Sequence, residues 1–351
     1  MKRWLKWLLS IGFYYSGIFV FTLLLRRLSG KRLSILTFHR VTSDEGCEGC
    51  GLPTINISQS NFQRLIDFVG KYFRVVSVED ILDRQNFYAQ KWTHCALLTF
   101  DDGYEEVFSR AIPLLAERGF PSVLFIPTAA IDKGYGFWWD LLYTKLTDST
   151  LILSKQIDKA FSSNAAIQKL GVALSTSDKE RKIAVLSFID ELQLINPELR
   201  DRTLSCLFEL LGLELEKDVS LQPKLLTWEK VKRCREQKMT VGAHTVNHEF
   251  LTSISANDAL SEITESKDIL ERRLNGSVLT FSYPGGRYDE GTLRIMKKSS
   301  YHCAFTSDEG LNSVKTDIFQ LKRINISDDN LVGPRGGFSR AIAAWALFFR
   351  W

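Results

Sequence analysis

Residues 95–103 read Cys95-Ala96-Leu97-Leu98-Thr99-Phe100-Asp101-Asp102-Gly103. A near-continuous apolar run of this kind is typical of a parallel strand that is covered on both faces. Parallel α/β barrels carry their reactive groups where the strands end, at the C-terminal face. The stretch therefore predicts a buried parallel strand that ends in a reactive carboxylate pair, Asp101 and Asp102.

Similar apolar runs recur along the chain and alternate with helix-like stretches, which is the pattern of repeated βαβ units. The expected strands are Leu33–Phe38, Arg74–Val76, Cys95–Phe100, Ser122–Ile126, Met239–Ala243, Val278–Tyr283, His302–Phe305 and Leu321–Ile326. The expected helices are Gln59–Tyr72, Tyr104–Arg118, Trp228–Gln237, Ala256–Leu274 and Gly291–Lys298. We predict an α/β fold, a distorted parallel (β/α) barrel of about seven strands.

The segment from about 134 to 223 interrupts this alternation, because it is polar and helical in texture and has no strand pattern. We predict a helical insertion within a catalytic domain that covers residues 31–351. The insertion opens with Phe137-Trp138-Trp139-Asp140. The tandem tryptophans either stack on a sugar or anchor the insertion to the barrel, and we favour the anchor.

Residues 1–30 contain an uncharged apolar segment, Leu8–Leu25, with basic residues on both sides. Its length is at the lower limit for a transmembrane helix, which needs about 20 residues. A single-span anchor, a helix lying in the membrane interface and an uncleaved signal peptide all fit this pattern. We expect a membrane-associated protein, at a bacterial inner membrane. The side that the catalytic domain faces is open, because three bases precede the segment and four follow it.

A second apolar segment, Arg340–Trp351, is too short to span a membrane. It either lies in the membrane interface or packs on the core. The chain has 351 residues, of which 45% are hydrophobic, and a formal net charge of +4. Much of the positive excess flanks the N-terminal apolar segment, which favours a membrane surface over nucleic acid as a partner.

Six cysteines in a chain of this length do not form a disulfide scaffold. Cys95 and Cys303 lie in strand-like runs, where a free cysteine behaves as a small hydrophobic residue. Cys47 and Cys50 form a single CxxC pair in a glycine-rich loop. Their role stays open between a loop thiol pair, which we favour, and a redox or metal function.

Two histidines four residues apart, His244 and His248, follow the expected strand Met239–Ala243. A tight loop or helical turn brings positions i and i+4 to one face, where two imidazoles can bind one ion. Together with one carboxylate they form a set of two nitrogens and one oxygen, which suits Zn, with Co or Ni as alternatives. The second carboxylate is left as a general base beside the metal. The pattern indicates a metal-dependent hydrolase.

Three motifs in this order resemble the NodB-homology polysaccharide deacetylases of carbohydrate esterase family four. They are Thr99-Phe100-Asp101-Asp102-Gly103, His244-Thr245-Val246-Asn247-His248 and Tyr283-Pro284-Gly285-Gly286. The similarity covers roughly residues 33–130 and 225–326. It implies a distorted (β/α) barrel that removes N- or O-acetyl groups from a saccharide with one divalent metal ion.

The resemblance also implies roles for single residues. Asp102, His244 and His248 correspond to the metal ligands, and Asp101 corresponds to the general base. The backbone N–H of Gly285 corresponds to the donor that stabilises the oxyanion.

The chain departs from the family pattern near its C-terminal end, where the usual Leu-x-His histidine, the general acid, is missing. His39, in Thr37-Phe38-His39-Arg40, is the better candidate because it ends the first expected strand. We expect His39 in the site, with its role as general acid left open. Arg323 is a candidate partner of the catalytic base, although a surface arginine fits its position as well.

The leading hypothesis is a deacetylase of an N-acetylated polysaccharide or lipid-linked glycan. A deformylase of a lipid-linked amino sugar is a close alternative, and release of formate in place of acetate distinguishes it. A saccharide-binding protein that kept the barrel but lost turnover is an alternative of another class. The missing late histidine favours that alternative, and the intact carboxylate and histidine pairs oppose it.

Overall fold

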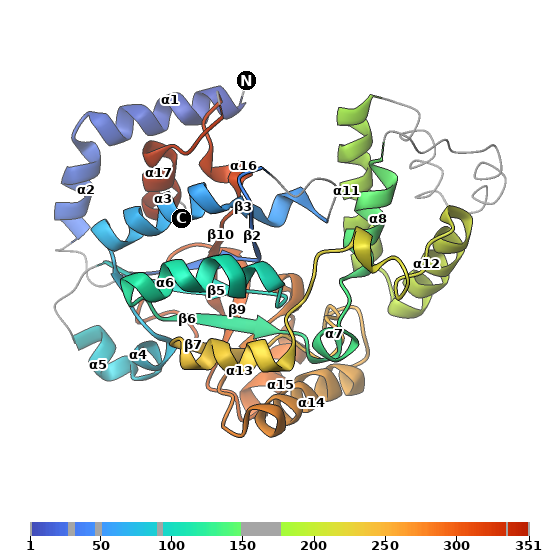
Figure 1. Ribbon diagram of the computed structural model, residues 1–351. Coiled ribbons are helices and arrows are strands. Elements are labelled where there is room, and N and C mark those ends of the chain that lie inside the picture. The colour runs from blue at the N-terminus through green and yellow to red at the C-terminus, as the bar shows by residue number, and fades with distance from the viewer. Residues whose placement is uncertain are drawn as a thin grey trace.

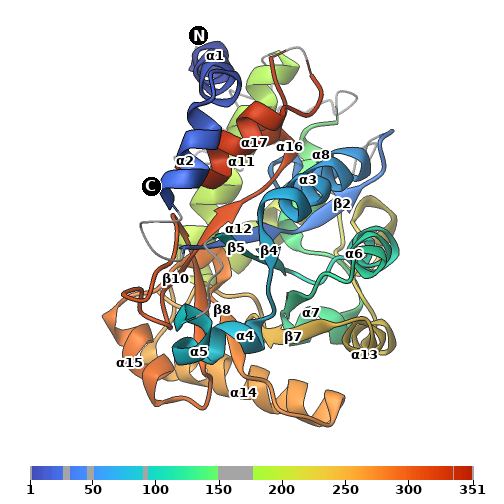
Figure 2. The ribbon, with the colours of Figure 1, turned by 90° about the vertical axis from the view of Figure 1, so that its left-hand side faces the viewer.

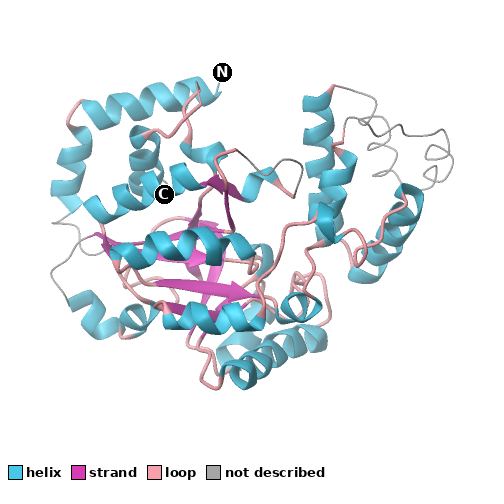
Figure 3. Ribbon diagram, viewed as in Figure 1, coloured by secondary structure: helices cyan, strands magenta, loops and turns pink. Residues whose placement is uncertain are grey.

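The computed structural model describes residues 2–26, 32–45, 51–89, 94–148, 177–334 and 336–349. Its centre is a ring of parallel strands with helices outside it (Figures 1 and 3). The ring follows the order β1 (Arg32–Phe38), β10 (Leu321–Asn325), β9 (Cys303–Glu309), β8 (Thr280–Ser282), β7 (Met239–Ala243), β6 (Ser122–Ile126) and β5 (His94–Phe100). The predicted parallel barrel of about seven strands is confirmed.

The ring closes between β1 and β5, which pair in parallel along their whole length, from Arg32 opposite His94 to Phe38 opposite Phe100. An eighth strand, β4 (Arg74–Val75), pairs only with the first residues of β5, whereas β6 pairs with its last residues. The apolar residues Cys95–Leu98 of β5 are completely buried. This double coverage explains why the strand reads as a continuous apolar run.

Helices cover the outside of the barrel. They are α3 (Gln59–Tyr72), α4 (Val78–Leu82), α5 (Arg84–Ala89), α6 (Ile112–Arg118), α7 (Thr128–Lys133), α13 (Trp228–Glu236), α14 (Ala256–Leu274), α15 (Glu290–Lys298), α16 (Asp328–Leu331) and α17 (Arg340–Phe349). The caps agree with the sequence. The Ser255 side chain accepts the N–H of Asp258 at the start of α14, and Asn275 ends it in a left-handed conformation.

The expected helix Tyr104–Arg118 is interrupted by a π-helical turn, Val107–Ala111, directly before α6. Pro113 lies within this helical stretch and has no N–H. Its ring would also clash with the carbonyl group four residues earlier, so a wider turn relieves the conflict. A short parallel pair, β2 (Arg40–Thr42) and β3 (Asn56–Ser58), was not predicted.

Between β6 and β7 the described residues form no strand, as expected. Their α-helices are α7, α8 (Trp138–Leu146), α11 (Asp178–Leu194), α12 (Pro197–Leu211) and, directly before β7, α13. In Figure 1, α8, α11 and α12 lie together at the right of the barrel. The boundaries of a separate insertion stay a prediction. Cys47 and Cys50 lie outside the described residues.

The N-terminal arm consists of two helices, α1 (Lys2–Tyr15) and α2 (Ile18–Arg26), separated at Ser16-Gly17. Gly17 has a positive φ of 84°, which glycine adopts without strain. Figures 1 and 2 both place the arm against α17. Within the described ranges, the structure contains no helix with the length and apolar character to cross a membrane.

The C-terminal helix α17 packs on the core, which decides between the two interpretations of the segment Arg340–Trp351. Ala343, Ala344, Leu347 and Phe348 are completely buried. Phe348 contacts Phe73 at 4.9 Å between ring centroids.

Candidate metal-binding site

Most of the predicted site residues follow strands of the barrel and meet at one end of it. His39 comes directly after β1, Asp101 and Asp102 after β5, and His244 after β7. Parallel strands place their carboxyl ends at the same rim, so these distant parts of the sequence converge there. The arrow of β6 in Figure 1 points to this end, toward α7 and the insertion.

Asp102, His244 and His248 form the centre of the site. One ligand atom from each lies within 4.8 Å of the others, and this is the only group of its kind that the described residues contain. The Nε2 atoms of His248 and His244 lie 3.2 and 3.5 Å from Asp102 Oδ1. Asp102 and His244 are 5% and 2% exposed. The structure therefore brings together the three predicted metal ligands.

The donor set fits a divalent cation. Asp102 Oδ1 is buried and accepts no hydrogen bond of acceptable geometry from the described part of the chain, although two imidazole nitrogens are close to it. His244 Nδ1 lies 2.7 Å from the Ser282 carbonyl oxygen, so Nδ1 carries the proton and Nε2 presents its lone pair to Asp102. A carboxylate oxygen and two imidazole nitrogens that face one another at these distances are the donor chemistry of a metal site.

The electrostatics of the cluster favour a positive charge among these side chains. Burial would raise the pKa of the Asp102 carboxyl, but the His244 and His248 imidazoles hold it well below its ordinary value. Burial would lower the pKa of His244, but the Asp102 and Asp101 carboxylates raise it. The two anionic groups thus attract positive charge to this position.

The backbone of the site is strained. Among the described residues, five non-glycine residues have a positive φ, and three of them are Asp102, Thr245 and His248. A side chain in this conformation is held there by its surroundings at an energetic cost, and such residues gather at functional sites. The Glu262 carboxylate supplies part of the restraint, because it accepts the backbone N–H groups of Val246 and Asn247 at 2.7 and 2.9 Å.

Asp101 is held by Arg323, as predicted for the partner of a catalytic base. The guanidinium donates two hydrogen bonds of 2.9 and 2.8 Å to the carboxylate, and both residues are 2% exposed. Arg323 Nε donates to the Thr306 carbonyl oxygen at 2.7 Å. Burial would raise the pKa of Asp101, but Arg323 and His244 hold it below its ordinary value. The alternative of a surface arginine is wrong.

His39 lies close enough to the cluster for its titration to depend on the charges there. Burial lowers the pKa of His39, while the Asp102 and Asp101 carboxylates oppose this effect. Its Nδ1 atom is buried and has no hydrogen-bond partner among the residues that the structure describes. The imidazole is therefore available to a group that enters the site.

Gly285 lies in the turn after β8, three residues beyond Ser282, which contacts both Asp101 and His244. Its φ is +58°, and an added Cβ would lie 2.7 Å from the Phe250 ring. Only glycine fits this position without displacing Phe250. The turn thus brings a backbone N–H and little bulk to the rim of the site.

The two tryptophans of the insertion have different environments. Trp139 is 6% exposed, stacks on Phe137 at 4.3 Å and lies 5.0 Å from the His248 ring. Trp138 is half-buried and lines a cavity of about 490 Å³ beside His248, between the start of α8 and α12. The anchor prediction describes Trp139, although Trp139 lines the same cavity, and the Arg200 guanidinium lies 6.0 Å from the centre of the Trp138 ring.

A buried charge network behind the site was missed at the level of sequence. Arg40 is completely buried and its Nη2 donates to Glu106 at 2.6 Å. Asp140 accepts hydrogen bonds from the Tyr104 hydroxyl at 2.8 Å and from the Leu52 N–H at 3.0 Å. Burial raises the pKa of Asp140 to about 6, against the charge of Arg40. Among these residues the sequence draws attention only to Arg40, because it follows the candidate site residue His39.

A second pair that the sequence did not reveal ties helix α12 to the loop that carries His248. Arg200 on α12 is 8% exposed and donates two hydrogen bonds of 2.7 Å to Glu249, the neighbour of His248. Nothing in the sequence connects these residues, because 49 positions separate them.

The profile of the polysaccharide deacetylase family matches residues 90–304, which is more than half of the 351-residue chain. The chain belongs to the polysaccharide deacetylase family. The matched range contains both carboxylates, both histidines and the turn at Gly285. The resemblance inferred from the three motifs is confirmed.

YxkH of Bacillus subtilis (strain 168), which is assigned to the same family, is 28% identical to the chain over 102 residues. The matched stretch covers 29% of this chain and 37% of YxkH. The chain thus spans little more than a third of the length of this curated relative.

Solved deacetylases have a similar fold. IcaB from Ammonifex degensii matches with a TM-score of 0.55 and 17% identity, over 91% of this chain and 98% of IcaB. The Streptococcus pyogenes deacetylase PplD, solved in complex with acetate, matches with a TM-score of 0.54 and 18% identity, over 87% of this chain and 96% of PplD. At these identities the similarity concerns the fold.

Proposed function

We propose that this protein is a metal-dependent hydrolase that removes acetyl groups from an N-acetylated saccharide. One observation carries the proposal: the buried cluster of Asp102, His244 and His248 lies beside the Asp101–Arg323 pair at the C-terminal end of the barrel. Membership in the polysaccharide deacetylase family supports the reaction class.

Asp102, His244 and His248 would hold one divalent cation, with Zn favoured by the donor set and Co or Ni as alternatives. Bound there, such an ion would supply Lewis-acid chemistry to the acyl carbonyl and would lower the pKa of the attacking water. The three side chains need little rearrangement to bind it, because the loop restraints and the Ser282 carbonyl already orient them.

Asp101 is proposed as the general base. It removes a proton from the water as the water oxygen forms a bond to the acyl carbon. Arg323 keeps Asp101 ionised and fixes the direction of its carboxylate through two hydrogen bonds. The Gly285 N–H is proposed to donate a hydrogen bond to the oxyanion of the tetrahedral intermediate.

Breakage of the carbon–nitrogen bond requires that the leaving amine receives a proton. Asp101 holds the proton that it took from water, and His39, whose buried Nδ1 has no hydrogen-bond partner among the described residues, offers a second route. We propose His39 as a site residue on this route, because a deacetylase of this family needs a general acid and the late histidine is missing. Acetate and a free amino sugar are the products.

The saccharide is proposed to lie in the cavity beside His248. Trp138 offers an apolar ring face, and Asp201, Ser205 and Asn247 offer polar groups around it. Aromatic faces with a few polar groups nearby are suited to sugars, which have apolar faces and hydroxyl edges. We further propose that the enzyme works at a membrane surface, because its N-terminal arm exposes apolar residues between basic ones.

The proposal is tested by metal analysis together with acetate and formate release from N-acetylglucosamine oligomers and other N-acylated oligosaccharides. His244→Ala is expected to lose bound metal and turnover together. Asp101→Asn is expected to keep the metal and to lose roughly 10²–10⁴-fold in rate. Turnover that survives complete metal removal would refute the proposal, and formate as the only product would favour a deformylase. A metal-loaded wild type that binds oligosaccharides without hydrolysis would favour a binding protein.

A further inference from the structure

One face of the N-terminal arm is packed firmly on the barrel. Phe13 and Phe19 are 5% and 2% exposed. Phe13 contacts Trp345 of α17 at 5.8 Å between ring centroids, and Phe19 contacts Phe348 of the same helix at 5.2 Å. The arm is therefore part of the folded protein. The face of the arm opposite the packed one points away from the barrel.

That opposite face is apolar and exposed. Eight of the fourteen exposed large apolar side chains in the described ranges lie in the arm: Trp4, Leu5, Leu8, Leu9, Tyr15, Ile18, Val20 and Phe21. Their exposed fractions run from 47% to 73%. Single exposed apolar residues are ordinary on protein surfaces, but a contiguous group marks a surface that binds something.

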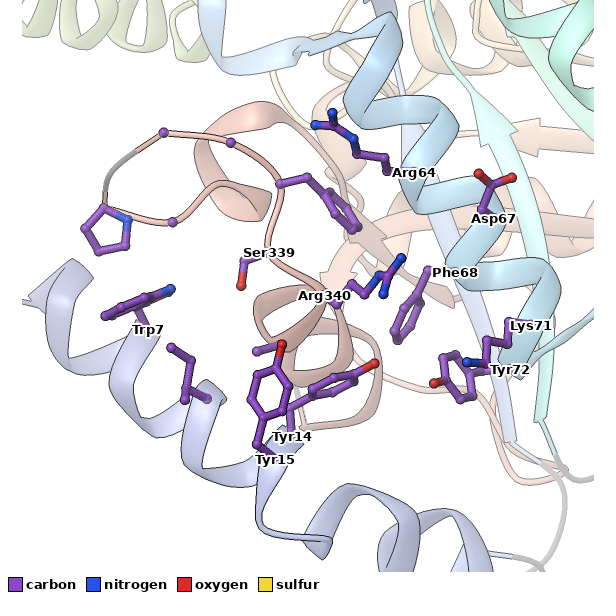
Figure 4. Close-up of a pocket in the computed structure, with 17 residues that line it drawn as sticks. Trp7, Tyr14, Tyr15, Arg64, Asp67, Phe68, Lys71, Tyr72, Ser339 and Arg340 are labelled. Carbon is purple, nitrogen blue, oxygen red and sulfur yellow. The ribbon is translucent and has the colours of Figure 1, made fainter.

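A basic cavity of about 640 Å³ adjoins the arm. Figure 4 shows Tyr14 and Tyr15 reaching from α1 toward Arg340 at the start of α17, with Phe68 and Lys71 of α3 on the opposite side. The cavity therefore combines aromatic side chains from the arm with bases from the body of the protein.

The charge of this cavity is positive. Arg64, Lys71 and Arg340 line it, together with a single acid, Asp67. Asp67 already pairs with Arg118, whose Nη2 lies 2.7 Å from its carboxylate. The cavity also adjoins the N-terminus of the ten-residue helix α17, whose dipole adds positive potential.

We propose that the arm docks in the plane of a bilayer that contains anionic lipids, and that the basic cavity takes one of their phosphate head groups. An interfacial helix buries its apolar face about 5–10 Å deep, with basic and aromatic residues at head-group level. The arm has this composition, because Trp4 and Trp7 alternate with Lys2, Arg3 and Lys6 in the sequence.

The charge of the arm argues against a second copy of the chain as the occupant. Residues 1–32 contain seven bases and no acid. Two arms that packed face to face would bring like charges together, whereas an anionic bilayer complements them. In Figure 1, α2 lies at the end of the molecule away from α7 and the insertion, so docking leaves the catalytic end uncovered.

The test is co-sedimentation of the full chain with vesicles of phosphatidylcholine, with and without phosphatidylglycerol. Wild type is expected to bind the anionic vesicles more tightly. Leu8→Glu combined with Phe21→Glu is expected to weaken binding to the vesicles at least about tenfold. The reason is that two apolar side chains are no longer buried against the lipid acyl chains. Leu260→Glu on α14, also exposed, is the matched control and is expected to bind like wild type.

The cavity is tested separately with Lys71→Gln and Arg340→Gln. Each substitution is expected to weaken binding to anionic vesicles about fivefold, since a base near the surface contributes about 1 kcal/mol. Lys298→Gln on α15 is the control. Equal binding of wild type and these variants, or binding of inorganic phosphate without vesicle binding, would refute the lipid site.

Asp101→Asn is expected to bind vesicles like wild type, so failure of the proposed catalysis and failure of this proposal are distinguishable. Sedimentation of wild type without vesicles is the control for self-association. If the protein forms a dimer that the Leu8 and Phe21 substitutions abolish, and binds no vesicles, the exposed face is a self-association surface and the membrane proposal is wrong.

Discussion

Asp140 is expected to make the stability of the fold depend on pH, and Asp140→Asn is expected to remove that dependence. The carboxylate is completely buried, accepts hydrogen bonds from Tyr104 and Leu52, and has its pKa raised to about 6. In the unfolded chain an aspartate titrates near pH 3.9, which is about two units lower. Ionisation is thus harder in the folded protein, mainly because burial disfavours the charge.

The sign and size of the effect follow from this difference. Below about pH 4 Asp140 is protonated in both the folded and the unfolded chain. The contribution of Asp140 to the free energy of unfolding is then at its most favourable. As the pH rises toward 6 the unfolded chain loses the proton first, so the free energy of unfolding falls. About two pKa units correspond to a loss of roughly 3 kcal/mol, complete once the pH exceeds the folded value. Asparagine keeps the shape and cannot ionise.

The assay is urea unfolding of wild type and Asp140→Asn at a series of pH values from about 4 to 8. The difference between their free energies of unfolding isolates Asp140, because all other titrating groups are shared. Asparagine is expected to gain roughly 3 kcal/mol relative to aspartate across this range. Glu236→Gln, at an exposed carboxylate, is the control. If the difference between the two free energies of unfolding stays constant with pH, or changes in the opposite direction, burial does not raise the pKa of Asp140 and the reasoning is refuted.

Three substitutions test individual site residues. Arg323→Met is expected to destabilise the fold by about 3–5 kcal/mol, because Asp101 is left buried without its partner, and adding Asp101→Asn should recover part of the loss in urea unfolding. His39→Ala, if His39 protonates the amine, should slow amide hydrolysis about 100-fold or more but hardly slow hydrolysis of an aryl acetate, whose leaving group needs no proton. Equal losses on both substrates would exclude that role. Trp138→Ala should raise KM for oligosaccharides about tenfold with kcat unchanged, and Trp4→Ala should leave both constants at wild-type values; an unchanged KM would show that no sugar contacts Trp138.

The barrel and the clustering of Asp102, His244 and His248 could be predicted because both depend on local sequence patterns. Each inner strand is buried on both faces and therefore reads as an apolar run. The residue after such a run lies at the catalytic rim, so Asp101, Asp102 and His244 were found together with their strands. The predicted strand Val278–Tyr283 is shorter in the structure, Thr280–Ser282, because β8 pairs with its neighbours over few residues.

The buried charge network could not be predicted, because its partners are far apart in the sequence and their residue types are ordinary at the surface. Arg40 and Glu106 are separated by 66 positions. Only the folded chain reveals that both are enclosed and therefore must pair. The break of the N-terminal segment at Gly17 was also missed, because hydropathy alone does not distinguish one long helix from two short ones.

The insertion is linked to the proposed catalytic residues at three points. Asp140 binds Tyr104, two residues beyond Asp102; Trp139 packs on His248; and Arg200 binds Glu249, the neighbour of His248. These contacts restrain both loops that carry the proposed metal ligands, so the predicted insertion would help to hold the proposed metal site as well as the cavity. Deleting it would disturb metal binding and substrate binding together. Trp138 lines the cavity and also contacts two members of these links, Trp139 at 5.4 Å between ring centroids and Arg200 at 6.0 Å from its guanidinium carbon to the ring centroid. Bound metal should therefore be measured beside KM in the Trp138 variant.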